Sequence, residues 1–180
     1  MRVISGAAKG ILLKTPDGLA TRPTADRVKE ALFSIIQFEL QGTKVLDLFG
    51  GTGQLGIEAL SRGAKSCVFV DESKDACKLI QENLKRTKLE HTAQVICGDY
   101  AFFLKKCRES FDIVFLDPPY AEKFLENSLN LISEIDILQS GGIIVTERPV
   151  GKDLVCELPG YSRSKDYKYS KTILTLFRKN

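Results

Sequence analysis

The chain has 180 residues, 43% of them hydrophobic and 27% charged, which is an ordinary balance for one globular domain with a sizeable core. No stretch approaches the ~18 apolar residues of a membrane span, and residues 1–5 do not resemble the start of a signal peptide. The five cysteines form no CxxC pair and only one histidine is present, so neither a metal site nor a disulfide framework is expected. A reducing cytoplasm is the expected location.

The net charge of +3 is unevenly distributed along the chain. Residues 1–30 contain six Lys/Arg against three Asp/Glu, and residues 151–180 contain seven against three. The remaining residues, 31–150, contain 13 basic and 17 acidic side chains, a net charge of −4. If the two basic ends meet on one face, that face could attract phosphates, although ordinary solvated charge is an equally good explanation of this pattern alone.

The first 40 residues read as an extension ahead of a regular fold. Short strands are predicted over 2–5 and 10–13, followed by a loop over 15–24 with turn chemistry. A helix is predicted to begin with Thr24 as its N-cap and Asp26 in its first turn. Its buried face is expected to be Val28, Ala31, Leu32, Ile35 and Ile36.

From residue 43 onward, predicted strands and helices alternate. The strands are expected over 43–49, 66–71, 93–99, 111–117 and 141–149. The helices between them are expected over 55–63, 74–88, 100–108 and 123–135. Such alternation implies right-handed crossovers and a parallel sheet with helices on both faces.

The end of the chain departs from this alternation. Strands are expected over 153–159 and 169–179, and the segment between them is too short for a covering helix, so an antiparallel hairpin is predicted at one sheet edge. The expected fold is a doubly wound, mostly parallel α/β sheet of the Rossmann-like kind with an antiparallel C-terminal β-hairpin. A single domain is expected over 1–180, divided into an N-terminal extension over 1–40 and a catalytic core over 41–180.

Four consecutive predicted strands end in an aspartate, namely Asp47, Asp71, Asp99 and Asp117. In parallel sheets ligands bind beyond the carboxyl ends of the strands, so these carboxylates should line one functional edge. A glycine-rich turn, "GGTG" at 50–53, follows the first of them and would let a ligand approach the backbone closely. Asp71 follows Asp47 by 24 residues, near the ~20-residue interval at which an acid meets ribose hydroxyls.

No phosphate-binding GxxxxGK[ST] pattern is present, but glycine spacing alone leaves NAD open. The whole set of acids, with "GDY" and "DPPY", resembles the class I methyltransferases that use S-adenosylmethionine and release S-adenosylhomocysteine. By that resemblance the 47–53 loop holds the methionine end, Asp71 the ribose hydroxyls and Asp99 the adenine amine, while Tyr100 or Phe102 packs on the adenine. The implied cofactor-binding residues are Asp47, Phe49, Gly50, Gly51, Thr52, Gly53, Asp71, Glu72, Asp99 and Tyr100.

The "FLDPPY" stretch at 115–120 stops an apolar strand at a rigid corner, because prolines lack an N–H and have a fixed φ. The resemblance marks this motif as that of amino-methyltransferases. Asp117 and the Pro118 carbonyl could accept both hydrogens of an exocyclic amine, Pro119 would keep them rigid, and Tyr120 would stack on a base. An ionised carboxylate is acceptor-only and favours the N1–H and N2–H₂ donors of guanine, although some adenine-N6 methyltransferases also carry DPPY.

With "RVISGAAKG", "RPTADRVKEALFSII" and "LDLFGGTGQLGIEALSRGA" added, the whole chain resembles the RsmD family, bacterial 16S rRNA guanine-N2 methyltransferases. The resemblance implies 16S rRNA as the partner, within a small-subunit particle, and the equivalent of guanine 966 as the target. A monomer without a metal is expected. The implied RNA-contacting residues are Lys9, Arg22, Thr24, Arg27, Lys165 and Lys168. The segment 7–12 is less basic than the family's usual pattern, and Glu58 is as well explained by a structural role.

Other functions remain open from the residues alone. An adenine-N6 methyltransferase acting on DNA or RNA is the nearest, although 180 residues leave no room for a separate DNA-reading domain. Methylation of a small molecule or of a protein glutamine would make the basic ends irrelevant. A catalytically silent RNA-binding assembly factor would not need the complete set of acids, and an NAD-dependent oxidoreductase lacks a well-placed proton donor.

Overall fold

The computed structural model describes residues 1–16, 23–119, 123–154 and 157–180. Its centre is one eight-stranded sheet with the strand order β3-β2-β1-β4-β5-β8-β6, and β7 also pairs with β8. The strands are β1 (Lys44–Asp47), β2 (Ser66–Asp71), β3 (Ala93–Cys97), β4 (Phe111–Leu116), β5 (Leu138–Pro149), β6 (Tyr161–Arg163), β7 (Tyr167–Tyr169) and β8 (Thr172–Lys179). β1 to β5 are parallel, and the order reverses at β1, which lies between β2 and β4.

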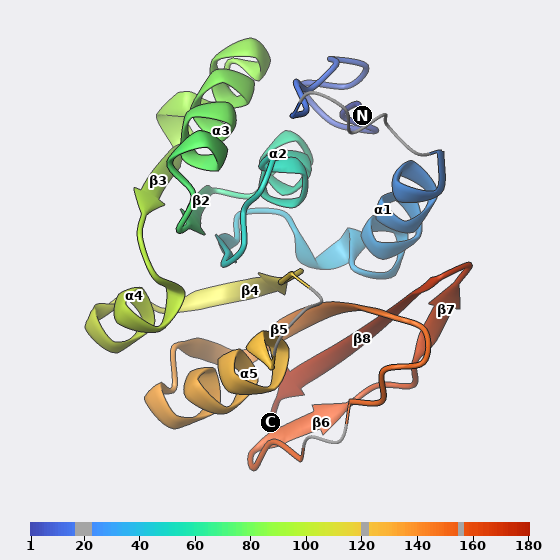
Figure 1. Cartoon of the computed structure of the whole chain (residues 1–180), viewed down its shortest axis with the longest axis vertical. Coiled ribbons are helices and arrows are strands. Elements are labelled where there is room, and N and C mark those ends of the chain that lie inside the picture. Colours follow the sequence, from blue (N-terminus) through green and yellow to red (C-terminus); the bar gives the residue numbers. More distant parts are fainter. Residues whose placement is uncertain (17–22, 120–122, 155–156) are drawn as a thin grey trace.

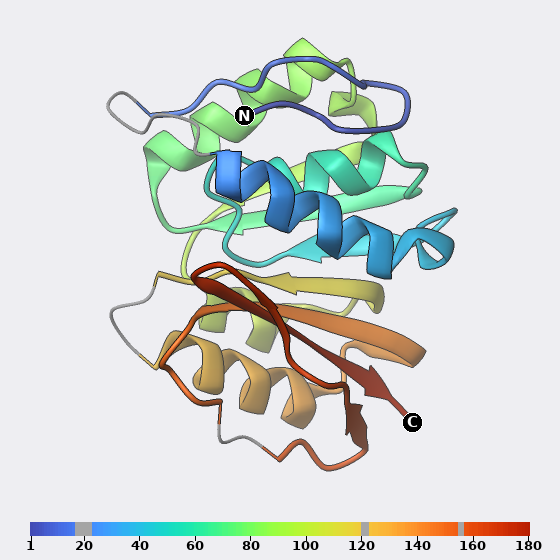
Figure 2. The same cartoon turned by 90° about the vertical axis from the view of Figure 1, so that its right-hand side faces the viewer.

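Helices cover both faces of the sheet (Figures 1 and 2). They are α1 (Pro23–Ile35), α2 (Gln54–Ser61), α3 (Lys74–Thr87), α4 (Tyr100–Lys106) and α5 (Phe124–Ile135), with short 3₁₀ turns at Gln37–Glu39 and Glu90–Thr92. One core cluster joins α1, α2 and α3 to the sheet, and the other joins α4 and α5 to the opposite face. Adjacent strand residues divide between them, for example Val45 in the first and Leu46 in the second, as a two-sided sheet requires. The predicted fold class is therefore confirmed.

The N-terminal segment folds back on itself before α1. The two predicted strands shorten to a single antiparallel bridge between Arg2 and Leu12, supported by a bond from the Val3 amide to the Ile11 carbonyl (3.0 Å). The prediction of Thr24 as N-cap is wrong, because α1 begins at Pro23 and contains residue 24. Proline is favoured at the first helical position, where its missing N–H has no partner to lose.

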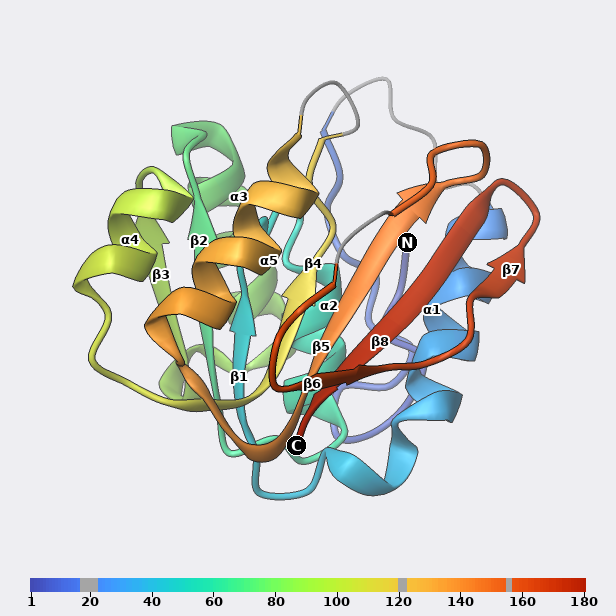
Figure 3. The ribbon, with the colours of Figure 1, turned by 90° about the horizontal axis from the view of Figure 1, so that it is seen from below.

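The C-terminal strands differ from the prediction in detail. The described residues of 153–159 belong to no strand, and the C-terminal hairpin is formed by β7 and β8, with Ser170 and Lys171 between them. β8 runs antiparallel to β5 and lies between β5 and β6 (Figure 3). The physical reason is burial: the four residues 174–177 are all buried, so β8 needs cover on both faces and pairing on both edges. Leu154 and Leu158 instead reach the α5-side core from irregular chain.

Candidate active site at the carboxyl ends of the strands

The predicted row of acids forms at one edge of the sheet. Asp47 and Asp71 are the last residues of β1 and β2, Asp99 follows β3 by two residues, and Asp117 directly follows β4. β5 adds Glu147, which the sequence reasoning did not single out. The β4–β5 register pairs Leu116 with Thr146, so Asp117 and Glu147 are the next positions on two neighbouring strands.

A cavity of about 670 Å³ opens at this edge, and we call it the rim cavity. It lies where the strand order reverses, the usual ligand position in open parallel sheets. Its lining is Leu48, Phe49, Gly51, Asp71, Glu72, Ser73, Gly98, Tyr100, Asp117, Pro118, Pro119 and Phe124. The structure thus brings together eight predicted site residues that lie at or after the ends of four different strands. They are Phe49, Gly51, Asp71, Glu72, Tyr100, Asp117, Pro118 and Pro119.

The glycine turn and Asp71 hold each other in place. The Gly51 amide donates to Asp71 Oδ2 (2.8 Å), and the Ser73 amide donates to Oδ1 of the same carboxylate (2.9 Å). Gly51 and Gly53 have φ of 55° and 78°, a region that other L-residues rarely adopt. At Gly50 a Cβ would lie only 2.7 Å from Ile80 Cδ1, so any other residue there would force the Ile80 side chain to move. Asp71 still faces the rim cavity, with the exposed Glu72 beside it.

Asp47 is buried beneath this turn and does not line the rim cavity. Its Oδ2 accepts a hydrogen bond from the Gly56 amide (3.0 Å) in the first turn of α2. The pKa of Asp47 is raised to about 7, chiefly by burial; the Gly56 hydrogen bond opposes this shift and the charges of Asp117 and Asp71 add to it. Asp47 therefore supports the glycine turn from below.

Of the residues expected at the adenine, Tyr100 lines the rim cavity, whereas Asp99 and Phe102 do not. Asp99 is exposed and caps α4 by accepting from the Phe102 amide (2.7 Å), while its neighbours Gly98 and Tyr100 line the rim cavity. Phe102 is 60% exposed, lies under the Lys106 ammonium (4.2 Å) and does not line the cavity.

An aromatic wall forms instead from three residues. The ring of Tyr100 lies 5.1 Å from that of Phe49 and 5.9 Å from that of Phe124. Phe124 was not predicted as a site residue, and its only sequence signal was an aromatic residue shortly after the DPPY motif.

The corner formed by Asp117, Pro118 and Pro119 closes one end of the rim cavity. Burial raises the pKa of Asp117 to about 6, so its carboxylate is mostly ionised at neutral pH. Burial and then the charge of Asp117 raise the pKa of Glu147 to about 8, against a hydrogen bond from Thr172 that lowers it. Tyr120 lies outside the described residues. The site therefore pairs one mostly ionised acid with one mostly protonated acid on adjacent strands.

The predicted RNA-contacting residues form two groups. Lys9 and Arg27 line a hollow of about 410 Å³ between the N-terminal segment and α1, together with Arg2 and the acids Asp26 and Glu30. Lys165 lies two residues before β7 and Lys168 lies on it, and both side chains are exposed. Arg22 and the side chain of Thr24 lie outside the described part of the chain.

Two buried polar residues fix the N-terminal segment to this framework. Glu58 in α2 is fully buried and accepts from the amides of Ile4 (2.8 Å) and Ser5 (3.0 Å), while pairing with Lys29 (3.2 Å) and Arg62 (2.8 Å). Burial lowers the pKa of Lys29, and the charge of Glu58 opposes that shift. The structural role of Glu58 explains all of its contacts.

Asn83 in α3 is the second anchor and is also fully buried. Its Oδ1 accepts from the Lys14 amide (2.7 Å), and its Nδ2 donates to the carbonyls of Lys14 (3.0 Å) and Thr52 (2.9 Å). One side chain therefore ties the N-terminal segment to the glycine turn. No sequence signal indicated this link.

Within the described ranges, no three His, Cys, Asp or Glu side chains are grouped so that they could hold a metal ion. The helices that the structure describes include none long and apolar enough to cross a membrane.

Comparison with known proteins places the chain among methyltransferases. The family model described as "Conserved hypothetical protein 95" matches residues 1–178. YlbH from Bacillus subtilis, provisionally named an rRNA methyltransferase, is 46% identical over 162 residues, covering 88% of this chain and 86% of the relative. Ribosomal RNA small subunit methyltransferase D from Haemophilus influenzae is 35% identical over 158 residues, covering 86% and 82%.

Solved structures agree with these relatives. The Escherichia coli protein yhhF, provisionally named a methyltransferase, superposes with a TM-score of 0.90 at 28% identity, covering 100% of this chain and 98% of that one. SMU.776, crystallised with S-adenosylhomocysteine (SAH), shares the fold alone, with a TM-score of 0.69 at 18% identity over 90% of this chain and 51% of that one.

Proposed function

Because this chain belongs to the family described as conserved hypothetical protein 95, the RsmD family of methyltransferases, we propose that it methylates the exocyclic N2 of a guanine in 16S rRNA. S-adenosylmethionine is the proposed methyl donor, and the equivalent of guanine 966 in a small-subunit particle is the proposed target. The observation that carries the proposal is the acceptor-only, rigid Asp117 corner at the end of the rim cavity.

The rim cavity fits a nucleoside donor of this kind. Asp71 and Glu72 offer carboxylates to the ribose hydroxyls, and the open backbone of the 50–53 turn can accept the amino-acid end. We place the adenine against the aromatic wall of Phe49, Tyr100 and Phe124, with Asp99 at its edge. When bound, the donor supplies a methyl group on a sulfonium, which is already a good electrophile.

The task left to the protein is to prepare the nitrogen nucleophile. The lone pair of an exocyclic amine is delocalised into the base, so acceptors that hold both amine hydrogens turn it toward the methyl group. Ionised Asp117 and the Pro118 carbonyl are such acceptors, and the two prolines keep them fixed during transfer. A carboxylate has no hydrogen to donate, which suits the adjacent N1–H and N2–H₂ donors of guanine.

The test is methyl transfer from labelled S-adenosylmethionine to 16S rRNA from a strain that lacks the gene, with mass mapping of the methylated nucleoside. Asp117→Ala is expected to abolish transfer while donor affinity stays within about twofold, since the donor's main contacts lie elsewhere. Asp75→Ala, an exposed carboxylate on α3, serves as the matched control. Unchanged turnover in Asp117→Ala would remove the proposed role of the corner, and N6-methyladenosine as product would replace guanine with adenine.

A further inference from the structure

Two cysteines meet beside the rim cavity, at the carboxyl end of β3. Cys97 is the last residue of β3 and is exposed, whereas Cys77 lies in α3 and is buried. The two side chains share a hydrogen bond in which the Cys77 thiol is the donor. No CxxC spacing marks the pair, because the packing of α3 on β3 brings together two positions that are distant in the sequence.

Both sulfurs also contact the backbone of the segment that follows β2. The Cys77 thiol donates to the Asp71 carbonyl (3.3 Å), and the Cys97 thiol donates to the Glu72 carbonyl (3.9 Å). The Gly98 amide, next to Cys97, donates to the same Asp71 carbonyl (2.9 Å). Asp71, Glu72 and Gly98 all line the rim cavity, so the thiol pair lies next to the wall proposed to hold the donor ribose.

The position of the pair in the sheet links it to the donor site. β3 stands at one end of the strand order, with β2 beside it. An edge strand is paired along one side, so its end moves at a lower cost than the end of a central strand. The β2–β3 register pairs Cys97 with Asp71, and a displacement of Cys97 is therefore passed to a residue that faces the donor.

The two thiols differ in reactivity in the way that an oxidisable pair requires. Burial, and then the contact with Cys97, raise the pKa of Cys77 to about 12, so this residue remains a thiol. Cys97 is exposed and meets a dissolved oxidant first. Burial also raises the pKa of Cys67 and of Cys107, which makes both of them slower to react.

We propose that hydrogen peroxide converts Cys77 and Cys97 into a disulfide, and that this disulfide lowers the affinity of the protein for the methyl donor. The inference rests on the proposed function for its donor and adds a modification site that regulates the same cavity. Cys97 attacks one peroxide oxygen, the O–O bond breaks, and a sulfenic acid and one water form. The Cys77 sulfur then attacks the sulfenic sulfur, the S–OH bond breaks, and the hydroxide leaves with the Cys77 proton as a second water. The two thiols lose two electrons, and one peroxide gains them.

The disulfide changes the donor site in two ways. It removes the S–H donors from the Asp71 and Glu72 carbonyls, because both thiol protons are lost. It also draws α3 and the end of β3 together, since the two sulfurs must approach to about 2.05 Å. We expect donor affinity to fall by about fivefold to tenfold, which is the effect of losing about one hydrogen bond.

The first test maps the bond and measures donor binding. Wild-type protein is treated with hydrogen peroxide, the remaining thiols are blocked with iodoacetamide, and unreduced peptides are identified by mass spectrometry. We expect a linked Cys77–Cys97 peptide pair and a Kd for S-adenosylmethionine that is about fivefold to tenfold higher by calorimetry, with recovery in dithiothreitol.

Two variants control this test. Cys97→Ser should bind the donor within about twofold of reduced wild type and should not respond to peroxide, because serine keeps a donor for the Glu72 carbonyl and cannot form the bond. Cys107→Ser removes a thiol at the end of α4 and should respond as wild type does. Absence of the linked pair, or an unchanged Kd in the linked protein, would overturn the proposal.

The second test uses the reciprocity of linkage. The fraction of disulfide is measured in glutathione redox buffers with and without saturating S-adenosylmethionine. A donor that binds the dithiol form more tightly must favour that form by the same factor, so disulfide formation should become about fivefold to tenfold less favourable. An equilibrium that the donor does not shift overturns the coupling. If reduced wild type transferred no methyl group to 16S rRNA, the proposed function would fail instead, while the peptide map would still decide whether the disulfide forms.

Discussion

The Asn83 side chain is expected to contribute strongly both to the free energy of unfolding and to donor affinity. Asn83→Ala removes three hydrogen bonds: one from the Lys14 amide and two to the carbonyls of Lys14 and Thr52. Each bond contributes about 0.5–1.5 kcal/mol net, so the free energy of unfolding should fall by about 2–4 kcal/mol. For a chain of this size that corresponds to a fall in Tm of about 4–16 °C.

The assay is urea unfolding followed by circular dichroism, with S-adenosylmethionine affinity measured by calorimetry on the folded protein. Gln81→Ala is the matched control, because it makes the same kind of truncation on the same helix at an exposed position. Asn83→Ala should also weaken donor binding, since the Thr52 carbonyl in the glycine turn loses its partner. An unfolding free energy within about 0.5 kcal/mol of wild type would refute this reasoning.

Three further outcomes follow from the charges. Folding raises the pKa of Asp47 to about 7, so ionised Asp47 opposes folding, at a cost that grows as the pH rises from about 4 to 7. Asp47→Asn should therefore be more stable than wild type at pH 8, by up to about 4 kcal/mol. In parallel urea titrations this gain in unfolding free energy should shrink toward pH 4. Transfer should rise with pH through about 6 as Asp117 ionises, and a pH–rate profile that is flat from 5 to 8 would contradict its role as acceptor. RNA affinity should fall as salt rises, with a log–log slope of several units. In filter binding this slope should be smaller for Lys9→Ala, for Arg27→Ala and for the double variant Lys165→Ala/Lys168→Ala. An affinity that does not depend on salt would show that the basic ends do not contact RNA.

The elements with strong local patterns could be predicted from the sequence. β2 was predicted residue for residue over 66–71, because the five small or apolar residues 66–70 directly precede an aspartate. The Asp117 corner could be predicted equally well, since two prolines after an acid are a local sequence signal. The strand expected over 153–159 was wrong: its described residues belong to no strand, and Leu154 and Leu158 reach the core from irregular chain.

The contacts that complete the site could not be predicted because they join distant residues. Asn83 meets Lys14 across 69 positions, and Glu147 meets Asp117 only because β4 and β5 are neighbours. At Asp99 the opposite happened, and a local contact was overlooked. The acid at the end of β3 was interpreted through the sheet, but its nearest partner is local, the Phe102 amide three residues onward. That cap was visible as an aspartate before a helical stretch.

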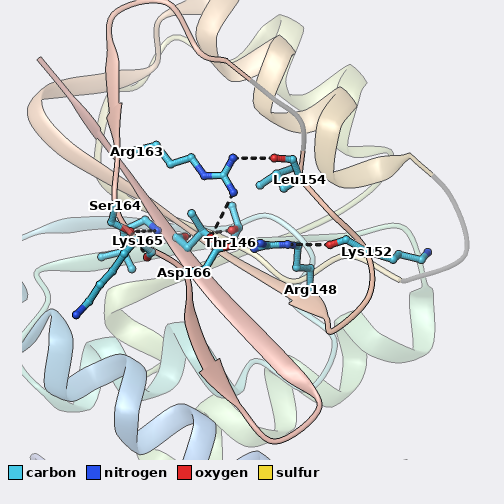
Figure 4. Close-up of polar contacts among 10 residues, drawn as sticks. Thr146, Arg148, Lys152, Leu154, Arg163, Ser164, Lys165 and Asp166 are labelled. Carbon is cyan, nitrogen blue, oxygen red and sulfur yellow. Dashed lines mark hydrogen bonds and ion pairs between the residues drawn. The ribbon is translucent and has the colours of Figure 1, made fainter.

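The position of β8 has a consequence for the order in which the protein matures. β8 is the last strand of the chain, yet it lies between β5 and β6 and carries Thr175, one of the partners of Arg148. Until β8 docks, the sheet ends at β5 and the arginine side chain lacks that partner. During synthesis the parallel part of the sheet can form first, while the buried Arg148 meets Thr175 only after β8 has been made. The last strand therefore completes a buried polar cluster around Arg148 (Figure 4) that the parallel strands alone cannot satisfy.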